Sequence, residues 1–370
     1  MKIKESRGKS LYIGKLPVGC QLCIKGQKAV FFLGGTCTNP KHCRWYCPIS
    51  EERRRPDSFY INEKRIESDQ DVLKEIDAID AKGISFTGGE PLGKSFDKVL
   101  YYLDLLKNKK KLDIHAHLYT TGIDATEEKL EKLGDAGLDE IRFHPPPGNY
   151  DAIGKAIHYI PDVGVEVPAI PTDENIEYIR NLIKFLEKIG GKFININEFE
   201  FSETNAKELK QKGFILKDGS LAAVEGSEES ARKILEWGKQ KGITKVSLHY
   251  CPIITKDEYQ LKNRYKRRAR KTRRSVEVIT RDGTVLFGRI NLDSEKELEK
   301  LQERMQVRLK ISRKNIEVNN EKKELYFHPK LLKNKTFLNL IKEYKSGIVE
   351  AIPLTNRVEC EYHPLRNFFK

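Results

Sequence analysis

Residues 28–251 alternate between short apolar stretches and amphipathic stretches, and this alternation restricts the fold more than any other feature of the sequence. The amphipathic stretches, such as 71–83 and 175–191, carry apolar residues at helical spacing, whereas the apolar stretches are typical of buried strands. We expect strands at 28–35, 83–91, 112–122, 138–148, 163–171, 192–201 and 244–251. Strands that alternate with helices form a parallel sheet with right-handed crossovers. The sequence therefore predicts an α/β fold, a partial barrel of about six or seven strand–helix units.

The last third of the chain lacks the regular strand–helix alternation and carries a different net charge. Residues 249–370 contain 29 Lys and Arg against 16 Asp and Glu, and this excess accounts for nearly all of the net charge of +14. Two apolar runs around Asp282-Gly283 predict a β-hairpin. We expect an N-terminal segment over 1–28, a core barrel over 29–255, and a basic linker with a small α+β domain over 256–370. The charge asymmetry favours a polyanionic partner.

The hydropathy pattern predicts neither a membrane span nor a secretory signal. No run approaches about 18 apolar residues, and the stretch 1–17 lacks an apolar signal core. We therefore expect a cytoplasmic protein that does not bind membranes. In that compartment, clustered cysteines are more often metal ligands or catalytic groups than disulfides.

Three of the seven cysteines, Cys37, Cys43 and Cys47, follow directly after the first expected strand. Their spacing is C-x5-C-x3-C. Three thiolates on one loop can each bind a different iron of a [4Fe–4S] cluster, which leaves the fourth iron without a protein ligand. A structural zinc site and a disulfide-stabilised loop are the alternatives.

The second expected strand ends in the motif TGGEP, which consists of Thr87, Gly88, Gly89, Glu90 and Pro91. Its glycines allow the backbone to approach a ligand closely, and the Glu90 carboxylate can accept hydrogen bonds from an ammonium group. A Gly-Gly-Glu turn alone is common. Here it stands at the C-terminal end of a strand, where folds of this kind gather their chemistry.

Together these motifs resemble the radical SAM superfamily. The cysteine triad follows the first strand of a partial barrel, the aromatic Tyr46 precedes the last cysteine, and Gly-Gly-Glu follows the second strand. The cysteine spacing is longer than the usual C-x3-C-x2-C of that superfamily, by two residues and then by one. Over residues 15–290, segments such as SFTGGEPL, HLYTTG, LDEIRFHP and NINEFEFSETN resemble an archaeal group of poorly characterised radical SAM proteins. That group is related to the pyruvate formate-lyase activating enzyme.

The resemblance implies two cofactors, a [4Fe–4S] cluster on the triad and S-adenosylmethionine (SAM). In this superfamily the open iron binds the amino and carboxylate groups of SAM. The reduced cluster cleaves SAM to a 5′-deoxyadenosyl radical, so an electron donor such as a ferredoxin or flavodoxin is an implied partner. The Gly-Gly-Glu element would bind the SAM amino group. Further SAM contacts are expected, by strand position, from Thr121, Arg142, His144 and Asn197, although Arg142 and His144 could instead form a salt-bridged strand end.

A second metal site is predicted from the remaining cysteines. Cys20 and Cys23 form a C-x-x-C motif ahead of the barrel, and Cys251 and Cys360 each lie near a histidine in the sequence. These thiolates, with or without the histidines, would suit zinc or a second iron–sulfur cluster. The alternatives are a reducible disulfide and ordinary buried thiols. Cys251 follows the last strand, so it could also face the substrate as a catalytic hydrogen donor.

The basic stretch 262–274 predicts contact with phosphate groups, because it contains nine Lys and Arg and no acidic residue. A helix that is cationic on every side is unusual for a merely solvated surface. The expected phosphate ligands are Lys262, Arg264, Lys266, Arg267, Arg268, Arg270, Lys271, Arg273 and Arg274. Tyr259 and Tyr265 could stack on bases. The alternatives are a solvated surface typical of a thermophile and a clamp onto acidic residues of the barrel.

The sequence therefore predicts a radical SAM enzyme that modifies RNA, either tRNA or rRNA. One alternative is a protein-modifying enzyme of the same superfamily, such as a glycyl radical activase. Another, of a different class, is a non-enzymatic RNA-binding protein with an iron–sulfur cluster or zinc. The intact Gly-Gly-Glu motif counts against the last alternative, because a protein without catalysis needs no SAM site.

Overall fold

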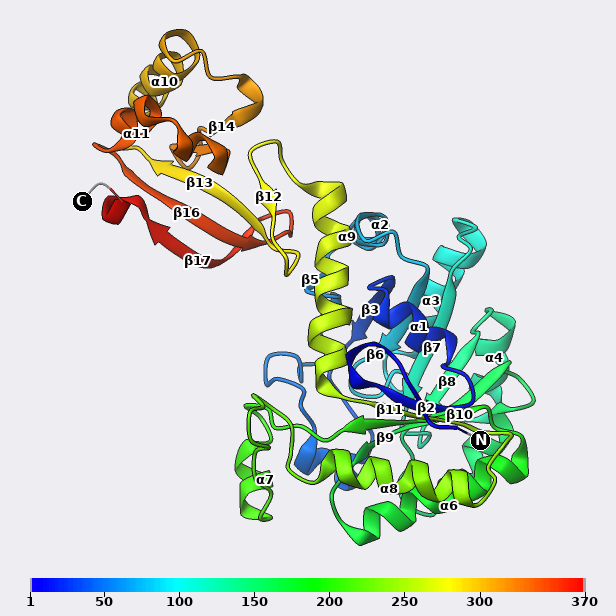
Figure 1. Cartoon of the computed structure of the whole chain (residues 1–370). Helices are drawn as coiled ribbons and strands as arrows, with labels where there is room; N and C mark the ends of the chain where they lie inside the picture. Colours follow the sequence, from blue (N-terminus) through cyan, green and yellow to red (C-terminus); the bar gives the residue numbers. More distant parts are fainter. Residues whose placement is uncertain (1, 369–370) are drawn as a thin grey trace. The chain divides into compact units, whose positions relative to one another are not determined.

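The computed structural model describes residues 2–368, and the chain divides into two compact units (Figure 1). The barrel unit comprises Met1–Asp77 and Ala81–Leu261. The C-terminal unit comprises Lys262–Lys370 together with Ala78–Asp80. None of the helices within residues 2–368 is long and apolar enough to cross a membrane.

Seven parallel strands form the centre of the barrel unit, which confirms the predicted partial α/β barrel. In spatial order they are β3 (Lys28–Leu33), β6 (Gly83–Thr87), β7 (His115–Thr120), β8 (Glu140–Phe143), β9 (Asp162–Ala169), β10 (Phe193–Glu198) and β11 (Ser247–Cys251). Antiparallel strands extend both edges: β4 (Phe59–Ile61) and β5 (Lys64–Arg65) beside β3, and β2 (Leu11–Ile13) and β1 (Lys4–Glu5) beside β11. The pairings end at β1 and β5, so the sheet is open.

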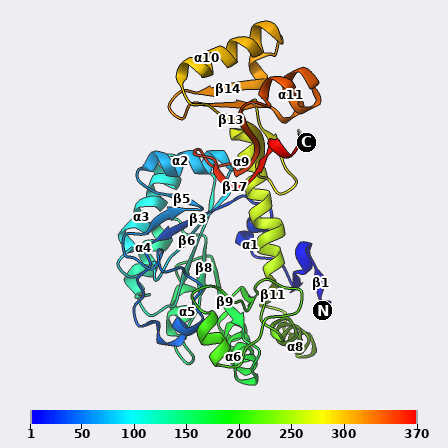
Figure 2. The same cartoon turned by 90° about the vertical axis from the view of Figure 1, so that its left-hand side faces the viewer.

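Helices connect successive parallel strands and cover the outer face of the curved sheet (Figure 2). They are α2 (Asp69–Ala78), α3 (Phe96–Leu103), α4 (Glu127–Asp135), α5 (Asp151–Ala156), α6 (Asp173–Ile189) and α8 (Ser227–Gln240). In α6, five buried apolar residues recur at helical spacing between Ile176 and Leu186. The Thr172 side chain caps its N-terminus by accepting a hydrogen bond from the Asn175 N–H, and Gly190 ends it with a φ of 84°. The short helices α5 and α7 (Ala206–Gln211) were not predicted, because six residues show little periodicity.

Helix α1 (Val18–Ile24) packs on the inner side of the sheet, against β3, β6 and β7. The Gly19 N–H donates a hydrogen bond to Glu140 Oε2 at 3.3 Å. A Cβ atom at position 19 would lie 2.6 Å from Arg142 Nη2 and 2.8 Å from His117 Cε1. Only glycine therefore allows α1 to approach the strands this closely.

The inner face of the sheet is polar, whereas the apolar core lies between the sheet and the outer helices. Side chains alternate between the two faces along each strand. On β7, for example, Ala116 and Leu118 are fully buried in the core, while His117 and Tyr119 face inward. Charged and amide side chains face inward from β3, β8, β9 and β10: Lys28, Glu140, Arg142, Glu166, Asn195 and Asn197. The interior of this barrel is thus built to hold polar groups.

The C-terminal unit consists of helix α9 (Lys262–Thr272) and an antiparallel sheet with its own core. The strand order is β14 (Ile316–Asn319), β15 (Glu324–Phe327), β13 (Val285–Asn291), β16 (Lys345–Ile352) and β17 (Val358–Pro364). Strand β12 (Val278–Ile279) pairs with β13 in a hairpin that turns at Asp282-Gly283. Helices α10 (Glu295–Glu303) and α11 (Lys335–Ile341) contribute Leu298, Leu301 and Phe337 to the core.

Candidate functional site

The loop that follows β3 and the loop that follows β6 are joined by backbone hydrogen bonds at the C-terminal end of the barrel. The Gly89 N–H donates to Gly34 O and the Glu90 N–H donates to Thr36 O, each at 2.8 Å. A Cβ atom at Gly88 would lie 2.5 Å from Gly34 O, and one at Gly89 would lie 2.1 Å from Thr36 O. The glycine pair is therefore required for the contact between the cysteine loop and the Gly-Gly-Glu loop.

The Glu90 carboxylate lies inside the protein rather than in the cavity. It is 3% exposed and accepts four hydrogen bonds. Oε1 accepts from Thr120 Oγ1 at 2.6 Å and from the Leu92 N–H at 3.1 Å, and Oε2 accepts from the Thr121 N–H at 2.8 Å and from Thr121 Oγ1 at 2.5 Å. Four donors occupy the usual capacity of a carboxylate. Glu90 and Thr121, both predicted to contact SAM, thus contact each other and join the loops after β6 and β7.

The three cysteines of the triad lie on the loop after β3, with Cys37 exposed and Cys43 and Cys47 partly buried. Burial, and then the neighbouring Cys37 and Cys47 thiols when ionised, raise the pKa of Cys43 to about 12. No three Cys, His, Asp or Glu side chains within residues 2–368 are already arranged as a metal-binding group. Three thiols on one loop fit the chemistry of a [4Fe–4S] site. Binding must then draw them together and displace their protons.

Tyr46 connects the cysteine loop to the strand end after β8. Its hydroxyl lies 2.7 Å from His144 Nε2, and its carbonyl accepts a hydrogen bond from Asn205 Nδ2 at 3.0 Å. Burial, followed by the nearby His42, lowers the pKa of His144 to about 4. The imidazole of His144 is therefore neutral at pH 7 and can orient the Tyr46 side chain.

A cavity of about 470 Å³ extends from the cysteine loop into the interior of the barrel. It brings together nine residues predicted from the sequence: Cys20, Cys23, Tyr46, Cys47, Thr87, Arg142, His144, Asn197 and Cys251. Its volume is in the range of sites for small ligands and cofactors. Cys37, Cys43, Glu90 and Thr121 do not line this cavity but lie in the loops at its rim.

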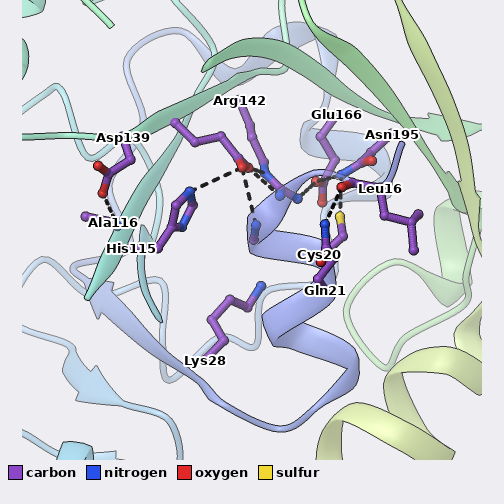
Figure 3. A network of polar contacts seen from close by, with 12 residues as sticks. Leu16, Cys20, Gln21, Lys28, His115, Ala116, Asp139, Arg142, Glu166 and Asn195 are labelled. Carbon is purple, nitrogen blue, oxygen red and sulfur yellow. Dashed lines mark hydrogen bonds and ion pairs between the residues drawn. The ribbon is translucent and has the colours of Figure 1, made fainter. Parts of the chain in front are cut away.

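Arg142 lies at the centre of an ion-pair network on the inner face of the sheet (Figure 3). It is 2% exposed and pairs with Glu140 and with Glu166, whose Oε2 lies 2.6 Å from Nη1. Glu166 also accepts hydrogen bonds from Asn195 and Asn197, each at 2.9 Å. Burial alone would raise the pKa of Glu166, but Arg142 and then the two amides lower it to about 2. Arg142 and Asn197, predicted as SAM contacts, therefore both hold Glu166.

Comparison with known proteins shows to which family this chain belongs. The family model for the radical SAM superfamily matches residues 33–200. A Methanocaldococcus jannaschii protein named "Putative glycyl-radical enzyme activating enzyme MJ0021" is 40% identical over 322 residues, which is 82% of each chain. The chain belongs to the radical SAM superfamily. It is an enzyme from the part of this superfamily that is related to glycyl-radical enzyme activating enzymes. It uses a [4Fe–4S] cluster and SAM, as the sequence predicted.

Similarity to solved structures is weaker. SuiB from Streptococcus suis shares 13% identity with a TM-score of 0.42, over 61% of this chain and 49% of SuiB. Coproporphyrinogen III oxidase (HemN) from Escherichia coli, described as a radical SAM enzyme, shares 10% identity with a TM-score of 0.36, over 61% of this chain and 57% of HemN. The matches thus span about half of those two proteins.

Three further thiols of this radical SAM enzyme line the barrel interior. Cys20 and Cys23 lie on α1, and Cys251 ends β11. Asn195 Nδ2 lies 3.2 Å from Cys20 Sγ, and burial raises the pKa of Cys20 to about 11 (Figure 3). Cys360 lies exposed on β17 of the C-terminal unit. A second metal site and a hydrogen donor at Cys251 both stay predictions.

The sequence analysis missed several polar residues of the radical SAM barrel interior, among them Lys28, Tyr119, Glu166 and Asn195. Each of these four stands within an expected strand, where apolar residues prevail, and its neighbours on either side face the opposite side of the sheet. A charged residue inside an apolar strand, such as Glu166 in VGVEVPAIP, is the signal that could have revealed them.

More than half of the basic side chains at 262–274 are buried or ion-paired within the C-terminal unit. Arg264 and Arg268 on α9 are 8% and 2% exposed, so they are not surface phosphate ligands. Three more of its residues form ion pairs: Lys262 with Asp282 at 2.8 Å, Arg267 with Asp80 at 3.3 Å, and Arg274 with Glu277 at 2.7 Å. Lys266 is partly buried, Arg270, Lys271 and Arg273 are exposed, and Tyr265 is only 9% exposed. Packing and ion pairing thus explain much of the stretch without a polyanion.

Proposed function

We propose that this radical SAM enzyme modifies a protein, by removing a hydrogen atom from a backbone glycine of a glycyl radical enzyme. The 40% identity to a protein named as a glycyl-radical enzyme activating enzyme, over 82% of both chains, carries this proposal. The sequence analysis had favoured RNA. Neither the family nor the relative's name supports RNA, and at least five of the nine basic residues at 262–274 are buried or ion-paired. The activase alternative is therefore the better interpretation.

The residues of this chain would position the reactants and exclude water. When bound, the [4Fe–4S] cluster and SAM supply a 5′-deoxyadenosyl radical, which takes one hydrogen atom from the substrate and becomes 5′-deoxyadenosine. Cys37, Cys43 and Cys47 would hold the cluster, and the Gly88-Gly89 turn would keep its loop in place. Tyr46 would face SAM, oriented by neutral His144. The glycine Cα would enter the 470 Å³ cavity, and the bound segment would displace water from it.

The enzyme needs an electron donor, and a ferredoxin or flavodoxin would fit this requirement. Such donors and iron–sulfur clusters are kept reduced in the cytoplasm. Seven free cysteines are consistent with that compartment.

An anaerobic activity assay tests the proposal. The protein is reconstituted with iron and sulfide, reduced, and supplied with SAM, and 5′-deoxyadenosine is quantified alone, with a glycyl radical enzyme from the same genome, and with total tRNA. We expect the glycyl radical enzyme to raise 5′-deoxyadenosine and to show the electron paramagnetic resonance doublet of a glycyl radical. The Cys43→Ala variant is the control without a cluster. Stimulation by tRNA and not by the protein would refute the proposal.

A further inference from the structure

Lys28 is a buried basic residue that lines the barrel cavity at the start of β3. It begins β3, is 6% exposed, and lines the cavity together with Cys23 of α1. Figure 3 shows its amine turned toward α1, on the same side of the sheet as Arg142. Burial by itself lowers the pKa of Lys28, but nearby Cys23 and Tyr119, when ionised, raise it above its usual value. A bound anion would act in the same direction as these groups, by favouring the ammonium form of Lys28.

The contacts of the Lys28 amine that the structure shows are both with Tyr119, whose ring centroid lies 5.8 Å from Nζ. Three cations line the cavity, and two of them have carboxylate partners: Arg142 pairs with Glu140 and Glu166, and Lys256 pairs with Glu200 at 3.3 Å. For Lys28, no carboxylate within residues 2–368 lies at ion-pair distance. Its hydrogen-bond partner is Tyr119 Oη at 3.4 Å, which is long for such a bond. An ammonium has three donors, and buried charges are normally paired.

The neighbours of Lys28 do not supply the missing anion. Glu166 accepts hydrogen bonds from Arg142 and from the Asn195 and Asn197 amides, and no ion pair joins it to Lys28 within residues 2–368. Burial raises the pKa of Cys20 and of Tyr119, so both are neutral at pH 7. A water molecule could satisfy one donor, but it brings no charge. The fold therefore leaves the buried Lys28 amine with donors that a ligand of opposite charge would complement.

We propose that Lys28 binds an anionic oxygen group of the substrate, a carboxylate or a phosphate, at the closed end of the barrel. This inference rests on the proposed function, which it deepens. The bound segment would place its glycine near the cysteine loop and an acidic group, one or more residues away, at Lys28. Such an anchor fixes how deeply the segment enters, and so which atom faces the reactive end of the cavity.

We expect the anion bound by Lys28 to differ from the carboxylate of SAM. Lys28 stands at the start of β3, whereas the cysteine loop follows Leu33 at its end. At about 3.3 Å per residue, the strand separates the two backbone positions by roughly 16 Å. Val30 lines the cavity between them. The cavity thus has a cofactor end and an anion end.

Binding of small anions tests the inference without turnover. The reconstituted holoenzyme is titrated with acetate, N-acetylglycine and inorganic phosphate, with sodium chloride at equal ionic strength as the reference, and thermal unfolding is followed. We expect saturable stabilisation of the wild type by at least one oxyanion. The Lys28→Met variant should bind it at least tenfold more weakly, and Lys28→Arg should retain binding. The matched control is Lys188→Met, an exposed position on α6. Preference between carboxylates and phosphate identifies the source of the group.

A second readout guards against a merely structural effect. In buffer without oxyanions, Lys28→Met should unfold at a midpoint about 2–4 °C higher than the wild type, because an incompletely paired charge has been removed. A lower midpoint would show that Lys28 is a structural partner of Cys23, and would overturn the inference. So would equal oxyanion affinity in wild type and Lys28→Met, or no saturable binding by the wild type. A wild type that binds oxyanions but generates no glycyl radical refutes only the proposed function.

Discussion

The substitution Glu90→Gln separates two roles that the Gly-Gly-Glu motif could have. If Glu90 contacts SAM directly, the substitution impairs SAM binding and leaves the fold unaffected. If Glu90 connects the loops, as its hydrogen bonds indicate, the substitution lowers the free energy of unfolding. Each carboxylate oxygen accepts one backbone N–H, from Leu92 or from Thr121. The amide nitrogen of glutamine must therefore face one of these donors, whichever way it is turned.

The expected loss can be worked out from those contacts. One hydrogen bond between a backbone N–H and a charged acceptor is lost, and that N–H is left buried without a partner. The Thr120 or Thr121 hydroxyl on the same side can rotate to accept from the new amide. We therefore expect the free energy of unfolding of the barrel unit to fall by about 2–4 kcal/mol.

Urea unfolding of the cluster-free protein measures this change, and SAM binding to the reconstituted protein is measured alongside. The matched control is Glu131→Gln, an exposed position on α4, which should stay within about 0.5 kcal/mol of the wild type. Thr121→Val should be less damaging, because the backbone N–H of residue 121 remains bonded. A Glu90→Gln variant that is as stable as the wild type but no longer binds SAM would refute this reasoning. That result would show instead that Glu90 contacts SAM directly.

Three further predictions concern the inner face and the cluster. Gly19→Ala should cost about 1–3 kcal/mol of unfolding free energy, since its Cβ would lie 2.6 Å from Arg142 Nη2. The control Gly154→Ala on α5, whose Cβ would have no atom within 4 Å, should be neutral or stabilise by up to about 1 kcal/mol. Urea unfolding measures both. The pKa of Glu166 is lowered to about 2. Its ionised form therefore contributes fully to the unfolding free energy above the ordinary pKa of 4.5, and this contribution is lost as the pH falls toward 2. Between pH 4.5 and pH 2, the unfolding free energy of the Glu166→Gln variant should change less with pH than that of the wild type. An unchanged pH dependence in the variant would contradict the ion-pair network around Arg142. Cys43→Ser should lose cluster iron and 5′-deoxyadenosine formation, whereas Cys360→Ser should keep both, as iron and product analysis will show.

The motifs near the strand ends could be found from the sequence because they are local. The triad and Gly-Gly-Glu each occupy a few consecutive residues, and the order of strands and helices places them at one end of the barrel. What Glu90 contacts was not predictable in the same way. Its donors Thr120 and Thr121 lie 30 and 31 residues away, on the next strand end.

The basic stretch shows the opposite case, where composition misled the prediction. Nine positive residues without an acid suggested an open phosphate-binding surface. Three of them pair with Asp80, Asp282 and Glu277, and Asp80 lies 187 residues from its partner Arg267 in the sequence. A net charge counts every residue equally, whereas folding decides which charges are buried and paired.

The sequence by itself determined the partial α/β barrel, the superfamily and its cofactors, because periodicity and short motifs are properties of neighbouring residues. Only the tertiary structure decided the contents of the barrel interior. Cys20 meets Asn195 across 175 residues, and Lys28 meets Tyr119 across 91. Whether a buried charge has a partner depends on which strands lie side by side and which face each residue takes. That is why the ammonium of Lys28, short of a carboxylate, became visible only in the folded chain.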